Sequence, residues 1–186
     1  MFIQTEATPN PATLKFLPGR DVLVGEPRDF RDMAAAETGS PLAAALFEVP
    51  GVTGVFLGSD FISVTKDDSN WSYIKPAVLG VIMEHFLSGQ PVLTTAGGEA
   101  VDAGEFFEAS DGETVEVIKE LIATRVRPAV AMDGGDITFK GFRDGQVYLH
   151  MQGACSGCPS STATLKSGIE NLLRHFVPGV EGVQQV

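Results

Sequence analysis

The sequence has few cysteines, few basic residues and no long apolar run. Among its 186 residues, Cys155 and Cys158 are the only cysteines. A small secreted scaffold held together by several disulfides is therefore excluded. Thirteen Lys and Arg stand against twenty-four Asp and Glu, which gives a formal net charge of −11. Nucleic acids and anionic membrane surfaces are bound by clusters of Lys and Arg, so we expect neither as a partner.

The chain also lacks segments that resemble a membrane span or a targeting signal. Its longest apolar run, Ala77 to Met83, is far shorter than the roughly 20 residues that cross a bilayer. The opening residues, Met1 to Glu6, show neither a signal-peptide pattern nor an Arg-rich presequence. We therefore expect a cytoplasmic protein of bacterial type, without a signal or transit peptide. Thiols in that compartment stay reduced unless they are catalytic or bound to metal.

An acidic middle segment divides the chain into two halves. Residues 91–110 carry four carboxylates and no basic side chain, and they are rich in Gly and Ala. Such a composition is typical of a flexible, self-repelling linker. We predict an N-terminal domain over residues 1–90, the linker over 91–110 and a C-terminal domain over 111–186.

Both halves show the pattern of a small α+β domain with an antiparallel hairpin packed on helices. In the first half, Ser40 and Pro41 start a short helix, residues 52–57 and 61–65 form a hairpin, and a long helix covers residues 71–87.

The second half predicts the order α-β-β-α. A helix begins at the capping box Ser110 to Glu113 and ends at Pro128. Strands cover residues 137–142 and 146–151, and a last helix ends before Pro178. The run Asp133-Gly134-Gly135-Asp136 is better explained as a turn into the first of these strands than as an acidic metal site.

The two cysteines lie in the loop between the second of these strands and the last helix. Pro159 suits the first helical position, which places Cys158 near the N-cap. The positive end of a helix dipole favours thiolate over thiol, and Gly153 and Gly157 permit a tight turn that aims both side chains the same way. This arrangement predicts a site for a soft metal, with Cys155 and Cys158 as its ligands.

Two thiolates are only half of a common metal site. Structural zinc and the usual iron–sulfur clusters take four ligands. The histidines are poor candidates, because His150 is on a strand, His175 is about 25 Å along the last helix, and His85 is in the other domain. The simplest completion is a second copy of the chain, which brings four cysteines to one cluster on a two-fold axis. A redox dithiol, a zinc site shared between copies and two incidental cysteines remain alternatives at this point.

Both halves contain recognisable family patterns. MDGGDI (residues 132–137) and GACSGCPSS (residues 153–161) closely resemble the NifU C-terminal domain of Nfu-type proteins. FIQTEATPNPATLKFLPG, SPLAAALFEVPGV and VFLGSDFISVTK resemble the Nfu N-terminal domain. Together these patterns cover nearly the whole chain apart from the linker.

The resemblance implies an iron–sulfur cluster scaffold or carrier without enzymatic activity. Such proteins bind a [4Fe–4S] cluster between two protomers and pass it to apo client proteins. The ligand role would fall on Cys155 and Cys158, and no catalytic residue is implied. The expected partners are a second copy of the chain in the cluster-bound state, apo client proteins and upstream cluster assembly proteins. The N-terminal domain would help to recognise partners or clients.

Overall fold

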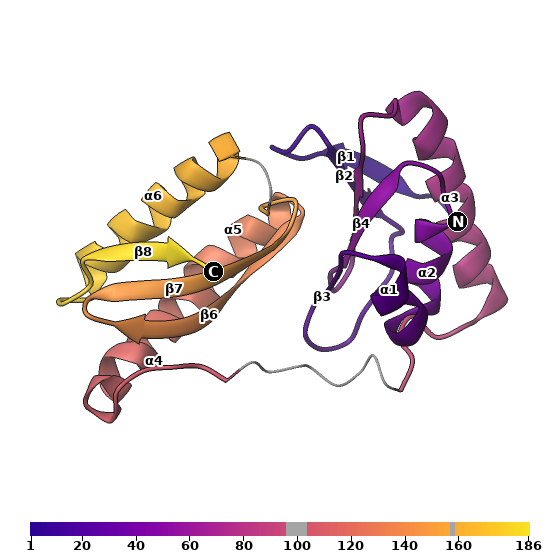
Figure 1. The fold of residues 1–186 in the computed structure, drawn as a ribbon. Coiled ribbons are helices and arrows are strands. Elements are labelled where there is room, and N and C mark those ends of the chain that lie inside the picture. The colour runs from indigo at the N-terminus through magenta and orange to yellow at the C-terminus, as the bar shows by residue number, and fades with distance from the viewer. Residues whose placement is uncertain (96–103, 157–158) are drawn as a thin grey trace. The chain divides into compact units, whose positions relative to one another are not determined.

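Each half of the chain folds around its own hydrophobic core. The computed structural model describes residues 1–95, 104–156 and 159–186. The chain divides into two units, Met1–Ala100 (unit 1) and Val101–Val186 (unit 2). Both units combine a β-sheet with packed helices, which confirms the predicted α+β class (Figure 1).

Unit 1 is built on a five-stranded antiparallel sheet in the order β1-β2-β5-β4-β3. Its strands are β1 (Gln4–Ala7), β2 (Thr13–Leu17), β3 (Arg28–Phe30), β4 (Val52–Leu57) and β5 (Ile62–Lys66). Its helices are α1 (Met33–Gly39), α2 (Pro41–Phe47) and α3 (Trp71–Ser88). The hairpin β4-β5 and the helices α2 and α3 correspond to the predicted elements.

Local sequence signals set the helix boundaries of unit 1. The hydroxyl of Ser40 accepts a hydrogen bond from the N–H of Ala43, and Pro41 is the first residue of α2. Asn70 caps α3 in the same way, and Gly89 ends it in the left-handed conformation. Helix α3 then presents Ile74, Val78 and Ile82 to the core.

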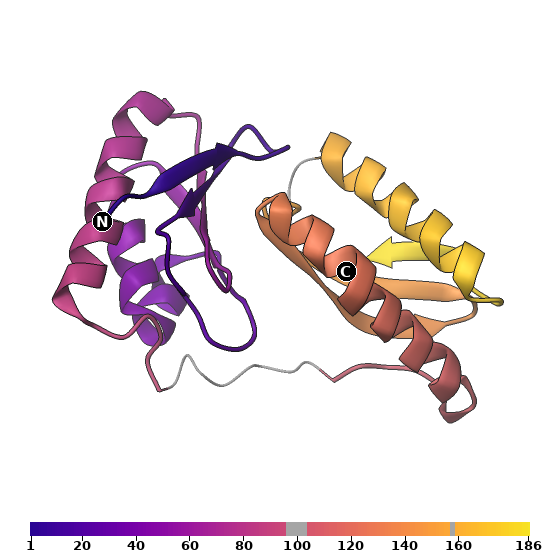
Figure 2. The same ribbon diagram turned by 180° about the vertical axis from the view of Figure 1, so that it is seen from behind.

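Unit 2 places its helices on one face of a three-stranded sheet, as Figure 2 shows for the rear of the view in Figure 1. In chain order its elements are η1 (Ala109–Asp111), α4 (Gly112–Leu121), η2 (Ile122–Val126), α5 (Arg127–Met132), β6 (Gly135–Arg143), β7 (Gln146–Gly153), α6 (Pro159–Phe176) and β8 (Gly182–Gln185). The predicted order α-β-β-α is present. The chain then adds β8, which pairs parallel to β7 and was not predicted.

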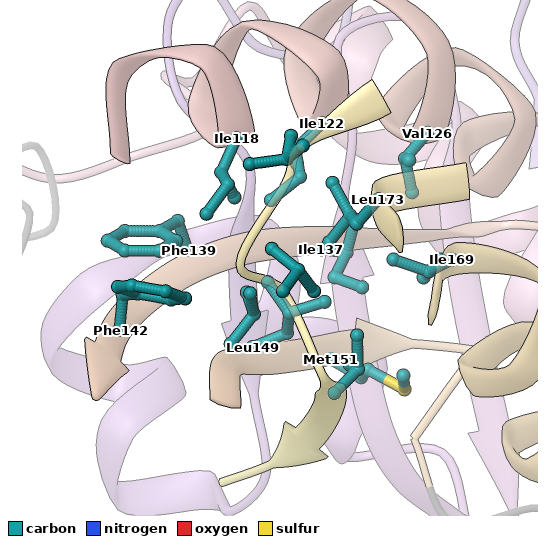
Figure 3. Close-up of a cluster of buried hydrophobic side chains, with 14 of the residues drawn as sticks. Ile118, Ile122, Val126, Ile137, Phe139, Phe142, Leu149, Met151, Ile169 and Leu173 are labelled. Carbon is teal, nitrogen blue, oxygen red and sulfur yellow. The ribbon is translucent and has the colours of Figure 1, made fainter. Parts of the chain in front are cut away.

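The core of unit 2 lies between this sheet and its helices (Figure 3). Along β7 buried and half-buried positions alternate, as expected for a strand with one face on the core. Leu149 and Ile137 are fully buried on the sheet, and Ile118 and Leu173 reach them from α4 and α6. This core holds the strand end that leads into the cysteine loop.

The first helix of unit 2 differs from the prediction at both ends. The expected capping box is wrong: Ser110 lies inside a 3-10 turn (η1), and the N-cap position of α4 is taken by Asp111, whose side chain caps no backbone N–H. The expected stop at Pro128 is also wrong. A π-helical turn, η2, joins α4 to α5, and the N–H of Arg127 bonds to the carbonyl of Ile122. The wider turn allows the helix to continue past a proline that cannot donate a hydrogen bond.

The ends of the segment predicted as a linker are bonded to the two units. The N–H of Thr94 donates to the carbonyl of Gly39 in unit 1. In unit 2, Phe106 forms a bridge to Gly141, and its ring occupies the space that a Cβ at Gly141 would need. Residues 96–103, the middle of the predicted linker, lie outside the described residues.

Across the described ranges, no helix combines the length and the apolar character that a membrane span requires.

Candidate metal centre

Cys155 lies where the sequence placed it, in the loop between β7 and α6. The loop leaves the sheet at Gly153, whose φ of 65° is in the left-handed region. Helix α6 begins at Pro159, as predicted. Cys158 lies outside the described residues, so the structure does not test the predicted pair of ligands.

Two glycines, Gly134 in the turn before β6 and Gly135 at the start of β6, lie next to Cys155 and Ala154. The N–H of Ala154 donates to the carbonyl of Gly134 at 3.2 Å. A Cβ built on Gly135 would lie 2.8 Å from the Cys155 sulfur and 2.5 Å from the carbonyl oxygen of Gln152. Both distances are shorter than real Cβ contacts, so only glycine fits here while Cys155 keeps this position.

Two hydroxyl groups bond to the backbone of the cysteine loop. Thr162, in the first turn of α6, donates from Oγ1 to the carbonyl oxygen of Cys155 at 3.0 Å. Ser156 donates from Oγ to the carbonyl oxygen of Gly153 at 2.9 Å. The loop is thereby tied to the helix that follows it and to the strand that precedes it.

The Cys155 side chain is nearly buried, with 6% of the residue exposed, and it forms part of the unit 2 core. Burial, together with the carboxylates of Asp133 and Asp136, raises the pKa of its thiol to about 12. The expectation that the helix dipole favours thiolate is therefore wrong for Cys155 in this position. Desolvation and two neighbouring negative charges outweigh the partial charge of a helix that starts four residues later.

Asp136 is held by a half-buried ion pair and is not a free metal ligand. Nε and Nη2 of Arg127 donate to its two carboxylate oxygens at 2.9 and 2.8 Å. Asp136 is 4% exposed, so its charge requires this partner. Gly134, with a φ of 82°, turns the chain into β6. The interpretation of residues 133–136 as a turn is confirmed.

Side chains of other types do not complete a metal site in the part of the chain that the structure describes. That part contains no group of three or more His, Cys, Asp or Glu placed to hold a metal ion. Nδ1 of His150 lies 3.0 Å from the carbonyl oxygen of Val186. The donor chemistry of Cys155 suits a thiophilic metal or an iron–sulfur cluster, but the remaining ligands must come from elsewhere.

Comparison with known families accounts for both units. The family model described as "Scaffold protein Nfu/NifU N terminal" matches residues 3–89, and the model described as "NifU-like domain" matches residues 118–184. A human protein named "NFU1 iron-sulfur cluster scaffold homolog, mitochondrial" is 50% identical over 188 residues, covering 100% of this chain and 72% of that protein. This chain belongs to the Nfu family of iron–sulfur cluster scaffold proteins.

A plant protein and a solved structure are also similar to this chain. "NifU-like protein 4, mitochondrial" from Arabidopsis thaliana is 50% identical, covering 100% of this chain and 66% of that protein. A solution NMR structure of a NifU-like protein from Saccharomyces cerevisiae is 26% identical, with a TM-score of 0.46, covering 51% of this chain and 86% of that one. This chain thus spans about two thirds to three quarters of the length of the two curated Nfu relatives.

These comparisons correct the expected location. We expected a bacterial-type cytoplasmic protein, whereas the human and Arabidopsis members of the family are named as mitochondrial. The expectation rested on the pattern of the first six residues. Both relatives extend beyond the aligned region, so the compartment cannot be read from residues that all three proteins share.

Sequence reasoning identified the cysteines but missed the residues that seat Cys155. Thr162 gave no signal, because a hydroxyl that bonds to a backbone carbonyl leaves no pattern in the sequence. Arg127, which holds Asp136 beside the same turn, gave none either. Gly135 did give a signal as part of a Gly-Gly pair. We attributed that pair to a turn, which holds for Gly134 with its positive φ, whereas Gly135 is needed for the space beside the sulfur.

Proposed function

We propose that this protein is a non-enzymatic carrier of a [4Fe–4S] cluster. Cys155 and Cys158 of two chains supply its four ligands, and the cluster is then transferred to apo-proteins. The cluster is cargo, since it arrives from upstream assembly proteins and leaves with a client. The homodimer is the cluster-bound state.

The observation that carries the proposal is the number and place of the thiols. An Nfu family member with only two cysteines, three residues apart, can supply half of a four-sulfur site from one chain. The described part of unit 2 offers no further set of ligands beside Cys155. A second copy of the same loop supplies the missing pair with the symmetry of a C2 dimer.

Cluster binding requires the Cys155 side chain to leave its present position. Only 6% of Cys155 is exposed here, and its sulfur lies close to the place that a Cβ on Gly135 would occupy. The first step of binding is therefore a movement of the loop that turns the sulfur toward solvent. The buried position protects the thiol when no cluster is bound.

We assign a different role to each of the two units. Unit 2 matches the NifU-like domain and contains Cys155, so it holds the cluster. Unit 1 contains no cysteine, and we assign it to the recognition of client and assembly proteins.

In its present position Cys155 is unsuited to be the reactive thiolate of the redox alternative, so that role would fall to Cys158, and a disulfide reductase assay separates the two functions. A dithiol oxidoreductase exposes at least one reactive thiolate to its substrate. Cys155 is instead 6% exposed, beside two carboxylates that disfavour its thiolate. A zinc site shared between two chains would use the same four sulfurs. Metal analysis of the purified protein distinguishes zinc from an iron–sulfur cluster.

Anaerobic reconstitution of the full chain with iron and sulfide tests the ligand assignment. We expect a broad visible absorbance and bound iron and sulfide in the native protein, and neither in C155A or C158A. The T38V variant alters a hydroxyl in unit 1 and should bind the cluster normally. Retention of the cluster by either cysteine variant, or zinc in place of iron after oxygen-free purification, would contradict the proposal.

A further inference from the structure

Thr162 is placed to control the position of Cys155. Its hydroxyl donates to the carbonyl oxygen of Cys155 at 3.0 Å, across seven residues of sequence. Thr162 belongs to α6, whose Leu173 and Ile169 are anchored in the core of unit 2. The bond therefore joins the loop residue to a helix that is fixed at a distance from the loop.

Cys155 is held from two sides by different kinds of contact. On one side, Gly135 leaves space for the sulfur but has no side chain that could hold it. On that side the loop is bonded through the neighbouring residue, from Ala154 N–H to Gly134 carbonyl. On the other side, the hydroxyl of Thr162 bonds to the backbone of Cys155 itself.

We propose that Thr162 is a positioning residue that holds Cys155 in its buried position, and that its hydrogen bond must open before the sulfur can bind an iron–sulfur cluster. The statement about cluster binding rests on the proposed function, whereas the statement about the buried position concerns the cluster-free chain alone. Thr162 does not touch the cluster in this scheme. It sets the fraction of chains whose cysteine is exposed and ready to bind.

The fraction of chains with an exposed Cys155 sets how strongly loss of the Thr162 bond changes cluster binding. When a binding-competent state is rarely populated, apparent affinity is reduced by the fraction that is competent. Loss of one ordinary hydrogen bond shifts such an equilibrium about five-fold. Removal of the Thr162 hydroxyl should therefore raise the exposure of Cys155 about five-fold and tighten cluster binding by about the same factor for each contributing chain.

The exposure is measured by alkylation of Cys155 with iodoacetamide in full-length C158A, where Cys155 is the remaining thiol. T162V keeps the shape of the side chain and removes the hydroxyl, and we expect alkylation about five times faster. T162S restores the hydroxyl and should return the rate to that of C158A. T124V is a matched control, because Thr124 also donates to a backbone carbonyl of unit 2, that of Glu120 at 2.7 Å, away from Cys155.

An unchanged alkylation rate in T162V, with a preserved circular dichroism spectrum, would overturn the positioning role. An equal increase in T124V would also overturn it, because the effect would then be general loosening. The thiol readout needs no cluster, so it remains decisive even if C155A retains a cluster and the proposed function fails.

The cluster readout uses T162V and T162S with both cysteines present. The concentration of an iron chelator that removes half of the cluster iron should rise at least about five-fold in T162V and remain at the native value in T162S. If alkylation rises, C155A loses the cluster and chelator resistance in T162V is unchanged, the coupling between the Thr162 bond and cluster binding is refuted.

Discussion

At the residue scale, the account depends on how tightly Cys155 fits against its neighbours. Gly135 is the sharpest case, since a single added methyl group would meet both the cysteine sulfur and a strand carbonyl. Neither contact is the flexible end of a long side chain. The backbone or the cysteine must shift.

G135A should therefore destabilise unit 2 by about 1–3 kcal/mol, the usual range for overpacking a well-packed site. It should also expose Cys155, because an added methyl group at residue 135 and the buried sulfur cannot both keep their places. Urea unfolding followed by circular dichroism measures the first effect, and the rate of iodoacetamide alkylation in the C158A background measures the second. G168A is the matched control, because Gly168 lies exposed in α6 with nothing within 4 Å of its Cβ position. A helical Gly-to-Ala change there should be neutral or stabilise by up to about 1 kcal/mol. Equal stability of G135A and G168A would contradict this explanation.

The Arg127–Asp136 ion pair gives a second prediction at this scale. R127M leaves the buried carboxylate without its partner and should cost about 3 kcal/mol of unfolding free energy. R127M/D136N removes the uncompensated charge and should recover most of the loss. Trp71, the single tryptophan, lies in unit 1, so its fluorescence serves as an internal reference that should not change. If R127M unfolds at the native urea concentration, the pair does not hold the turn.

At the element scale, helix α3 contains the clearest pH-sensitive group. His85 is 6% exposed, and its Nε2 has no hydrogen-bond partner among the described residues. Burial lowers the pKa of His85 below its ordinary value of 6.5, and a backbone bond at Gln90 offsets part of this effect. The unfolded chain therefore binds a proton at a higher pH than the folded chain does.

Unit 1 should consequently lose stability as the pH falls below about 6.5, since protonation then favours the unfolded state. H85L should flatten this dependence and leave unit 1 at least as stable at pH 5.5, because the unpaired buried nitrogen is gone. Urea unfolding followed by Trp71 fluorescence reports on the correct unit. H175Q changes an exposed histidine of unit 2 and should behave like the native chain. A native pH dependence in H85L would exclude His85 as its source.

Elements with a local signal were predictable, and those fixed by tertiary contacts were not. The Ser40-Pro41 start of α2, the β4-β5 and β6-β7 hairpins and the beginning of α6 follow from caps, turns and alternation in the sequence. Strand β8 was missed because it is only four residues long and its pairing with β7 is formed across the whole of α6. We expected Pro128 to end the helix because a proline cannot donate the backbone hydrogen bond of an α-helix. The π-helical turn η2 changes the hydrogen-bond pattern before Pro128, and the helix continues. At the site, the thiols were identifiable from their spacing, but the contacts that bury Cys155 arise only when β6, β7 and α6 come together.

At the scale of the whole molecule, each chain has two separate cores, and the proposed functional unit is two chains that share one cluster. The family match covers both units, and each has a complete hydrophobic core of its own. The proposed cluster joins two chains through unit 2, so binding of the cluster and dimerisation should occur together. Loss of the cluster should return the chains to the association state of the apo protein.

The most direct test of this account is the mass and the iron and sulfide content of one anaerobically reconstituted sample. Native mass spectrometry should show two chains with four iron and four sulfide, the composition of a single [4Fe–4S] cluster with four cysteine ligands. Chelation of the iron should remove the cluster-dependent dimer. A complete cluster bound to one chain would contradict the account, because Cys155 and Cys158 of one copy cannot supply four sulfurs.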